Sequence, residues 1–154
     1  MFASGRIHKT YWAIVAGTPE HTEGRIDLPL VKQSEASNRW WMKVDEGGSS
    51  AGALNAVTSY RVLGSCGGIS WLELKPETGR THQLRVHCAA IGHPIFADKI
   101  YGEANPGEWL NLHAQSLKIP LYPKKDPLHV QASPPPHMLE KLIACGYAPQ
   151  TPFI

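Results

Sequence analysis

Most of the chain alternates between hydrophobic and polar residues in a way that predicts short β-strands. Six segments are rich in β-branched and aromatic residues and are bounded by glycine, proline or polar residues: residues 9–17, 39–45, 55–64, 68–76, 111–119 and 127–133. Residues 24–31 alternate until they meet Pro29, which predicts a short edge segment, and the polar run at 32–38 predicts a loop.

Two segments have helical periodicity instead. In residues 80–92, Leu84, Cys88 and Ile91 recur at the spacing of one helix face. Residues 135–146 begin with prolines and end at a glycine, which are the usual signals for the start and stop of a helix. Antiparallel strands with two separated helices indicate an α+β fold, a mostly antiparallel sheet with two main helices.

The chain organisation points to one folding unit. With 154 residues the sequence has the length of one domain, and we expect residues 1–154 to form one domain without a second. Residues 55–64 and 68–76 are expected to pair across the turn at 65–67. The flexible tract at 47–52, GGSSAG, is expected to be a hairpin connection because neither side of it is long enough for a comfortable domain.

Composition and charge narrow the class of protein. Hydrophobic residues make up 42%, no stretch reaches the ~20 apolar residues of a membrane span, and no secretion signal opens the chain, so we expect a cytoplasmic protein. Three cysteines without a CxxC spacing indicate neither disulfides nor a zinc site. A formal net charge of +2 does not by itself indicate nucleic-acid binding.

The candidate chemistry concentrates between residues 75 and 102. A turn at Thr78 is followed by a predicted helix whose first turn carries Arg80 and His82, and unpaired N–H groups at a helix start favour anions. One turn further, the guanidinium of Arg85 suits a carboxylate held at two points. On spacing alone, solvated surface charges are the favoured interpretation of both arginines.

Three other combinations of residues give weaker indications of a functional site. A metal site from His82, His87, Cys88 and His93 fails because histidines five apart do not share a helix face. A triad from Ser70, His82 and Asp98 lacks a nucleophile elbow. The tryptophans at positions 12, 40, 41 and 109 can stack on bases, but core filling is the favoured interpretation.

One run carries a resemblance that spacing does not supply. The sequence LKPETGRTHQLRVHCAAIGHPIFADKIYG, residues 74–102, resembles the third motif of the RluA-type pseudouridine synthases. KTYWAIVAG is similar to the lysine-tyrosine strand of that family, and LNLHAQSLKIP with PLHVQASPPPHM is similar to its closing strands. These segments cover nearly the whole chain.

The resemblance implies an isomerase that converts a uridine within RNA to pseudouridine without a metal or organic cofactor. It places Tyr11 on the family's active-site tyrosine and Arg85 on the arginine that pairs with the catalytic aspartate. Arg80, His82 and Lys75 are then expected to contact RNA. The expected partner is structured RNA, ribosomal RNA in the first place and transfer RNA as the alternative, with no DNA and no membrane.

The sequence departs from the family at the nucleophile. The family's catalytic aspartate precedes the lysine-tyrosine strand in a His-Arg-Leu-Asp segment, and here eight residues precede Lys9 and do not contain it. None of the four aspartates has that context, so we expect Arg85 to face an open cleft beside Tyr11 without an acidic partner. We therefore expect the chain to be the C-terminal part of such an enzyme, a fragment that is inactive alone. The expected protein partner is the missing N-terminal half. The alternative is a non-catalytic RNA-binding remnant.

Overall fold

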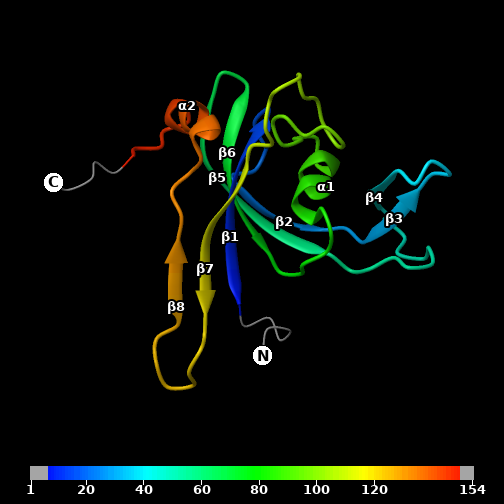
Figure 1. Cartoon of the computed structure of the whole chain (residues 1–154), viewed down its shortest axis with the longest axis horizontal. Coiled ribbons are helices and arrows are strands. Elements are labelled where there is room, and N and C mark those ends of the chain that lie inside the picture. Colours follow the sequence, from blue (N-terminus) through cyan, green and yellow to red (C-terminus); the bar gives the residue numbers. More distant parts are fainter. Residues whose placement is uncertain (1–6, 150–154) are drawn as a thin grey trace.

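The computed structural model describes residues 7–149 and has an α+β architecture, as predicted (Figure 1). A six-stranded antiparallel sheet has the strand order β2-β5-β6-β1-β7-β8, and β3 and β4 form a separate two-stranded sheet. The strands are β1 His8–Ala16, β2 Glu23–Asp27, β3 Leu30–Ser34, β4 Trp40–Val44, β5 Val57–Cys66, β6 Ile69–Pro76, β7 Leu112–Ile119 and β8 Leu128–Gln131. The helices are α1 Gln83–Ala90 and α2 Pro136–Ala144.

The alternation of side chains along β1 divides the core into two layers. Ala13 and Val15 pack with Leu84 and Cys88 of α1 in one cluster, the α1-side cluster. Ile14 packs with α2 in another, the α2 layer. Successive residues of a strand point to opposite faces of a sheet, so the two helices cover opposite faces. All three β1 residues are 0% exposed, so this part of β1 is fully buried between the two helices.

The β3–β4 hairpin packs on the far side of α1. Leu30 of β3, Met42 of β4 and Val86 of α1 belong to one buried cluster, and Figure 1 shows the hairpin projecting from the α1 side of the sheet. At the other end of the sheet, β8 is an edge strand whose four residues are all exposed. No helix in the part of the chain that the structure describes is long and apolar enough to cross a membrane.

Several sequence predictions are confirmed in detail. β5 and β6 pair as an antiparallel hairpin, and the segment at 24–31 is divided at Pro29 into β2, at the sheet edge, and the start of β3. The predicted loop at 32–38 is shorter, since β3 continues to Ser34.

The glycine tract does not connect a hairpin, so that prediction was wrong. β4 pairs with β3, and the tract at 47–52 carries the chain from β4 back to β3 before β5 begins. Two backbone hydrogen bonds join Leu30 and Leu54, at 2.9 and 2.8 Å, and fix this return. The tract therefore returns the chain to β3 of the small sheet before β5 begins.

The prediction that tryptophans fill the core is correct for Trp12 and wrong for Trp40 and Trp109. Trp12 packs edge-on against Trp71, with ring centroids 5.1 Å apart, in the α2 layer. By contrast, 38% of Trp40 and 71% of Trp109 is exposed. Both lie outside the main sheet, on the small hairpin and on the loop before β7, where each contacts a single histidine ring and, among residues 7–149, no buried cluster.

Candidate active site

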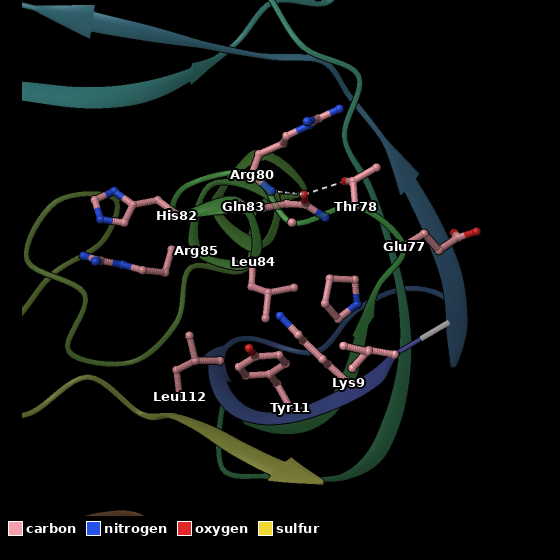
Figure 2. Close-up of a pocket in the computed structure, with 13 residues that line it drawn as sticks. Lys9, Tyr11, Glu77, Thr78, Arg80, His82, Gln83, Leu84, Arg85 and Leu112 are labelled. Carbon is pink, nitrogen blue, oxygen red and sulfur yellow. Dashed lines mark hydrogen bonds between the residues drawn. The ribbon is translucent and has the colours of Figure 1, made fainter. Parts of the chain in front are cut away.

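A cavity of about 740 Å³ lies between β1 and the start of α1. Its walls come from Lys9 and Tyr11 on β1, the turn at 76–80, the first residues of α1, and Leu112 at the start of β7. Figure 2 shows Tyr11 and Lys9 rising from β1 toward Leu84 of the helix. Three segments far apart in sequence thus meet around one space.

Lys9 and Tyr11 reach the cavity together because they are two positions apart on one strand. Side chains at i and i+2 of a strand point to the same face. The ring of Tyr11 also packs against the buried α1-side cluster, which holds it in place. Sequence reasoning did not select Lys9 as a site residue, although the two-residue spacing from Tyr11 was the available signal.

The turn before α1 is fixed by a fully bonded glutamine amide. Gln83 Oε1 accepts hydrogen bonds from Thr78 Oγ1 at 2.6 Å and from the Arg80 backbone N–H at 3.1 Å. Its Nε2 donates to Val57 O at 2.8 Å and to Thr58 Oγ1 at 3.0 Å. This network ties the turn to β5 and gives the cavity a rigid wall.

The start of α1 differs from the prediction. The helix begins at Gln83, and His82 is its N-cap with the left-handed backbone angle φ of 55°. Arg80 and His82 therefore precede the helix instead of lying in its first turn. Arg80 still lines the cavity, and its Nε donates to Asn55 O at 2.8 Å, which leaves its terminal N–H groups for other partners.

Arg85 lines the same cavity as Tyr11 and already has a carboxylate partner. Its Nε donates to Asp98 Oδ2 at 3.0 Å and its Nη2 donates to Asp98 Oδ1 at 2.7 Å. This geometry is the two-point pairing that the guanidinium favours. The expectation of an arginine in an open cleft without an acidic partner was wrong, because the loop after α1 brings Asp98 back onto the helix.

Asp98 is held from several directions. The residue is 0% exposed, and Oδ1 also accepts from the backbone N–H groups of Ile100, at 3.0 Å, and Tyr101, at 3.1 Å. Burial opposes ionisation, but the hydrogen bonds from Arg85 and from these two amides outweigh it and hold the pKa of this carboxyl below its usual value. Asp98 therefore stays charged, and its hydrogen bond raises the pKa of Arg85.

His82 lies at the rim, stacked on an aromatic ring of the small hairpin. Its ring is 5.1 Å from that of Trp40, with 14° between the planes, and its Nδ1 lies 2.8 Å from Tyr101 Oη. Burial, together with the charge of Arg85, lowers the pKa of His82. The uncharged imidazole is thereby favoured at the edge of the cavity.

Lys75 is separate from this group of residues. On β6, Leu74 packs in the α1-side cluster, so Lys75 points to the opposite face of the sheet. Its Nζ lies 3.6 Å from Glu73 Oε1. Lys75 therefore does not line the cavity that Arg80 and His82 line.

The weaker alternatives do not assemble. Among residues 7–149 no three His, Cys, Asp or Glu side chains gather as a metal site requires. His87 is buried, with Nδ1 2.8 Å from Thr58 Oγ1 and Nε2 2.9 Å from Leu28 O. Ser70 Oγ donates to Gly17 O at 2.7 Å instead of facing His82.

The chain resembles solved structures over most of its length. It matches the human RNA pseudouridylate synthase domain containing 1 with a TM-score of 0.73 and 30% identity, over 86% of this chain and 56% of that one. It matches the human RNA pseudouridylate synthase domain containing 4 with a TM-score of 0.74 and 26% identity, over 93% and 64% of the two chains.

Sequence relatives agree with the structural ones. An uncharacterised RNA pseudouridine synthase of Zymomonas mobilis is 43% identical over 138 residues, which is 87% of this chain and 60% of that protein. The ribosomal large subunit pseudouridine synthase D of the same organism is 40% identical over 103 residues, 67% of this chain and 31% of that protein. The chain thus spans 60% or less of the length of these two relatives.

The family comparison covers all the residues that line the cavity except Leu112. The model of the RNA pseudouridylate synthase family matches residues 1–90, which include β1, the turn before α1 and α1 itself. The resemblance to RluA-type enzymes rested on the same strand and the same motif, and it is confirmed. The chain belongs to the RNA pseudouridylate synthase family, a family of isomerases.

Proposed function

We propose that the chain forms the uridine-binding part of a pseudouridine synthase that acts on structured RNA, with ribosomal RNA as the first candidate. The observation that carries the proposal is that Tyr11, Arg80 and Arg85 line one cavity. One relative is named a ribosomal large subunit pseudouridine synthase, which supports ribosomal RNA over transfer RNA. The cytoplasm is the proposed location, although three plant relatives are named mitochondrial.

In this proposal Tyr11 contacts the uracil. The isomerisation detaches the base and rejoins it to the sugar through carbon, after which C5 must lose a proton. A phenol can both lie against a base and move a proton. Tyr11 has the position for both roles because its ring is anchored in the core below the cavity.

Arg85 is proposed to hold an anion with its remaining edge. A guanidinium has five N–H donors, and Asp98 accepts from two of its nitrogens, Nε and Nη2. Nη1 is left to bind the catalytic carboxylate or a phosphate of the substrate. Asp98 then acts as a positioning residue that fixes the orientation of the fork.

The nucleophile is proposed to come from a further segment. No aspartate is among the described residues that line the cavity, and Asp98 is already paired with Arg85. Promoting Asp98 to nucleophile would break that buried pair. We propose instead that a carboxylate from a segment like the His-Arg-Leu-Asp segment of the family completes the site, and that the chain alone does not turn over.

Lys9 and Arg80 are proposed to contact the RNA backbone at two sides of the cavity. Lys9 comes from β1 and Arg80 from the turn, and both carry N–H donors that suit phosphate oxygens. His82 is proposed as a rim contact that stacks or donates according to its partner. Lys75 is left out of the site because it lies on the other face of the sheet.

The second candidate function is a non-catalytic RNA-binding module. It is favoured by the same observation that no aspartate lines the cavity within residues 7–149. Such a module needs the cationic rim of Lys9 and Arg80 but does not need the phenol of Tyr11 to move a proton.

The test measures pseudouridine formation on ribosomal RNA that lacks the modification. Three samples are compared. They are the chain alone, the region of the 43% identical Zymomonas relative that this chain does not match, and both together or fused. We expect turnover only when both parts are present. Clear turnover by the chain alone would disprove the need for a further aspartate, whereas RNA binding without turnover in every sample would favour the binding module.

A further inference from the structure

A second cavity, of about 640 Å³, lies at the start of α2. Trp109 and Asn111 line it from the loop before β7, Phe96 from the loop after α1, and His137 and Lys141 from α2. We call it the Trp109 cavity. It shares no lining residue with the cavity around Tyr11, and it belongs to the α2 layer, since Phe96 packs there.

Trp109 is exposed and yet held in a defined position. The residue is 71% exposed, which is unfavourable for so large an apolar ring. Its backbone carbonyl accepts from Asn111 Nδ2 at 2.9 Å, and the next carbonyl, of Leu110, accepts from His137 Nε2 at 3.0 Å. The His137 ring contacts the indole edge-on, with centroids 5.7 Å apart. An ordered, exposed indole offers a stacking face.

A cation lies in the same cavity. Lys141 Nζ is 4.4 Å from the centroid of the Phe96 ring, which places the ammonium group beside the cavity wall. Lys141 forms no salt bridge with a carboxylate in the described part of the chain. The one acidic residue of the lining, Glu108, accepts from the Asn105 backbone N–H at 2.9 Å. Lys141 is therefore available to an anionic group.

Asn111, one of the residues that line the cavity, carries an unsatisfied acceptor. Asn111 is 2% exposed, and its Oδ1 is buried without a hydrogen-bond partner. Leaving a buried polar atom unpaired costs about 1–3 kcal/mol, so such atoms are rare in folded proteins. The donor side of the same amide is used by Trp109 O, which fixes the amide and leaves Oδ1 as the group in need of a donor.

We propose that the Trp109 cavity binds one unpaired nucleotide of the RNA, outside the site that handles the target uridine. The base stacks on Trp109 and the phosphate binds Lys141, while the amide of Asn111 holds the backbone carbonyl of Trp109 in place. An aromatic platform and a free cation are two groups that a nucleotide satisfies at once. The proposal rests on RNA being the substrate, and it adds a second point of contact that favours RNA with a single-stranded flank.

The test titrates the chain into a fluorescently labelled single-stranded RNA of mixed sequence and follows anisotropy. Trp109→Ala is expected to weaken binding by roughly fivefold to a hundredfold, the usual effect of losing one base stack, and Trp109→Phe is expected to retain most of the affinity. Lys141→Gln is expected to reduce the slope of log K against log salt by about 0.7, the loss of one phosphate contact. Since Trp109 is exposed, its replacement leaves the fold intact, which a melting curve checks.

Tyr122→Ala is the matched control, because Tyr122 is an exposed aromatic residue, at 62%, outside the cavity. The inference is overturned if Trp109→Ala binds RNA as tightly as the unaltered chain, if Tyr122→Ala loses as much, or if the unaltered chain does not bind. Pseudouridine formation by the reconstituted enzyme is scored separately. If the reconstituted enzyme turns over and Trp109→Ala does not weaken RNA binding, this site is overturned and the proposed function stands. If Trp109→Ala weakens RNA binding but no turnover occurs, the site stands and the proposed function is overturned.

Discussion

Arg85 and Asp98 form a two-point ion pair in which the carboxylate is completely buried and the arginine side chain is 18% exposed. The pair joins α1 to the loop after it, and Arg85 also lies over the Tyr101 ring at 5.3 Å. The Nε and Nη2 groups of Arg85 thus bind Asp98 within the fold, while the residue still lines the cavity. The arginine that the family resemblance assigns to catalysis is also part of what holds its own loop in place.

Asp98→Asn is expected to destabilise the chain by about 2–4 kcal/mol, because it removes the counter-charge of a largely buried arginine and weakens four hydrogen bonds. Denaturant unfolding measures this change. The matched control is Asp27→Asn, since Asp27 pairs with Arg25 at 3.5 Å where both side chains are more than half exposed. The control is expected to cost less than about 1 kcal/mol. Equal effects of the two substitutions would contradict a structural role for the buried pair.

The same pair predicts how stability changes in acid. The folded-state pKa of Asp98 lies below the unfolded value of 3.8, so the unfolded chain binds the proton more readily. The stability that Asp98 contributes is complete above that value and is lost as the pH falls through the lower, folded pKa. Unfolding measured between pH 5 and pH 2 should therefore show a decline that is smaller in Asp98→Asn.

His87 predicts a second pH dependence, at higher pH. Burial lowers its pKa from 6.5, and the neutral ring accepts from Thr58 Oγ1 and donates to Leu28 O. Because the folded pKa is below the unfolded one, stability is complete above about pH 6.5 and is lost as the pH falls toward the folded pKa. His87→Gln should flatten the stability profile between pH 7 and pH 5, leaving the slope due to His82, whose pKa is also lowered.

The exposed residue His129 of β8 supplies the comparison. His129→Gln removes an imidazole from the surface of the sheet edge and leaves the buried His87 in place. A profile that flattened equally in both variants would show that His87 is not the group responsible.

Gly64 is expected to tolerate no side chain. A Cβ atom there would lie 1.7 Å from the backbone oxygen of Cys145, just after α2, so either β5 or the end of the helix has to move. Gly64→Ala should cost about 1–3 kcal/mol or more in thermal or denaturant unfolding. Gly79→Ala is the control, since a Cβ at Gly79 meets nothing within 4 Å. A neutral Gly64→Ala would mean that α2 packs differently on the sheet.

Much of the fold could be predicted because its elements depend on local patterns. Alternation located the strands of the main sheet to within a few residues, and Gly146 marked the end of α2. The glycine tract was misassigned because pairing is non-local: nothing in residues 47–52 reveals that Leu54 returns to Leu30. The start of α1 was placed too early because the left-handed conformation of His82 is imposed by the turn and not by its own preference.

The cavity was predictable where one motif carried it and unpredictable where the chain folds back. Tyr11, Arg80 and Arg85 follow from the resemblance, and Lys9 could have been added from strand spacing. Lys75 lies outside the cavity because it follows Leu74, and the packing of Leu74 in the α1-side cluster is known only from the structure. Asp98 could not be paired with Arg85 from sequence, because a loop between them determines the contact.

Arg85→Lys is expected to impair the reconstituted enzyme even though the positive charge is kept. A lysine ammonium cannot bind Asp98 through two nitrogens and present a third to an anion in the cavity, because it is a point charge without the planar fork. Single-turnover pseudouridine formation should fall at least about tenfold. Measuring RNA binding and unfolding beside activity separates the loss of the fork from the loss of the fold.

Tyr11→Phe tests the proposed chemistry most cleanly, since it removes one oxygen and keeps the ring that packs against the α1-side cluster. If the phenol moves the C5 proton, the reconstituted enzyme should lose about 10²–10⁴-fold in the rate of pseudouridine formation, the usual contribution of a positioned acid or base. RNA affinity and the unfolding midpoint should stay near those of the unaltered chain, because the contact area of the ring is retained. Tyr122→Phe, on an exposed loop residue, should change none of these quantities. Full activity in Tyr11→Phe would confine Tyr11 to stacking and would move the proton transfer to another group of the completed site.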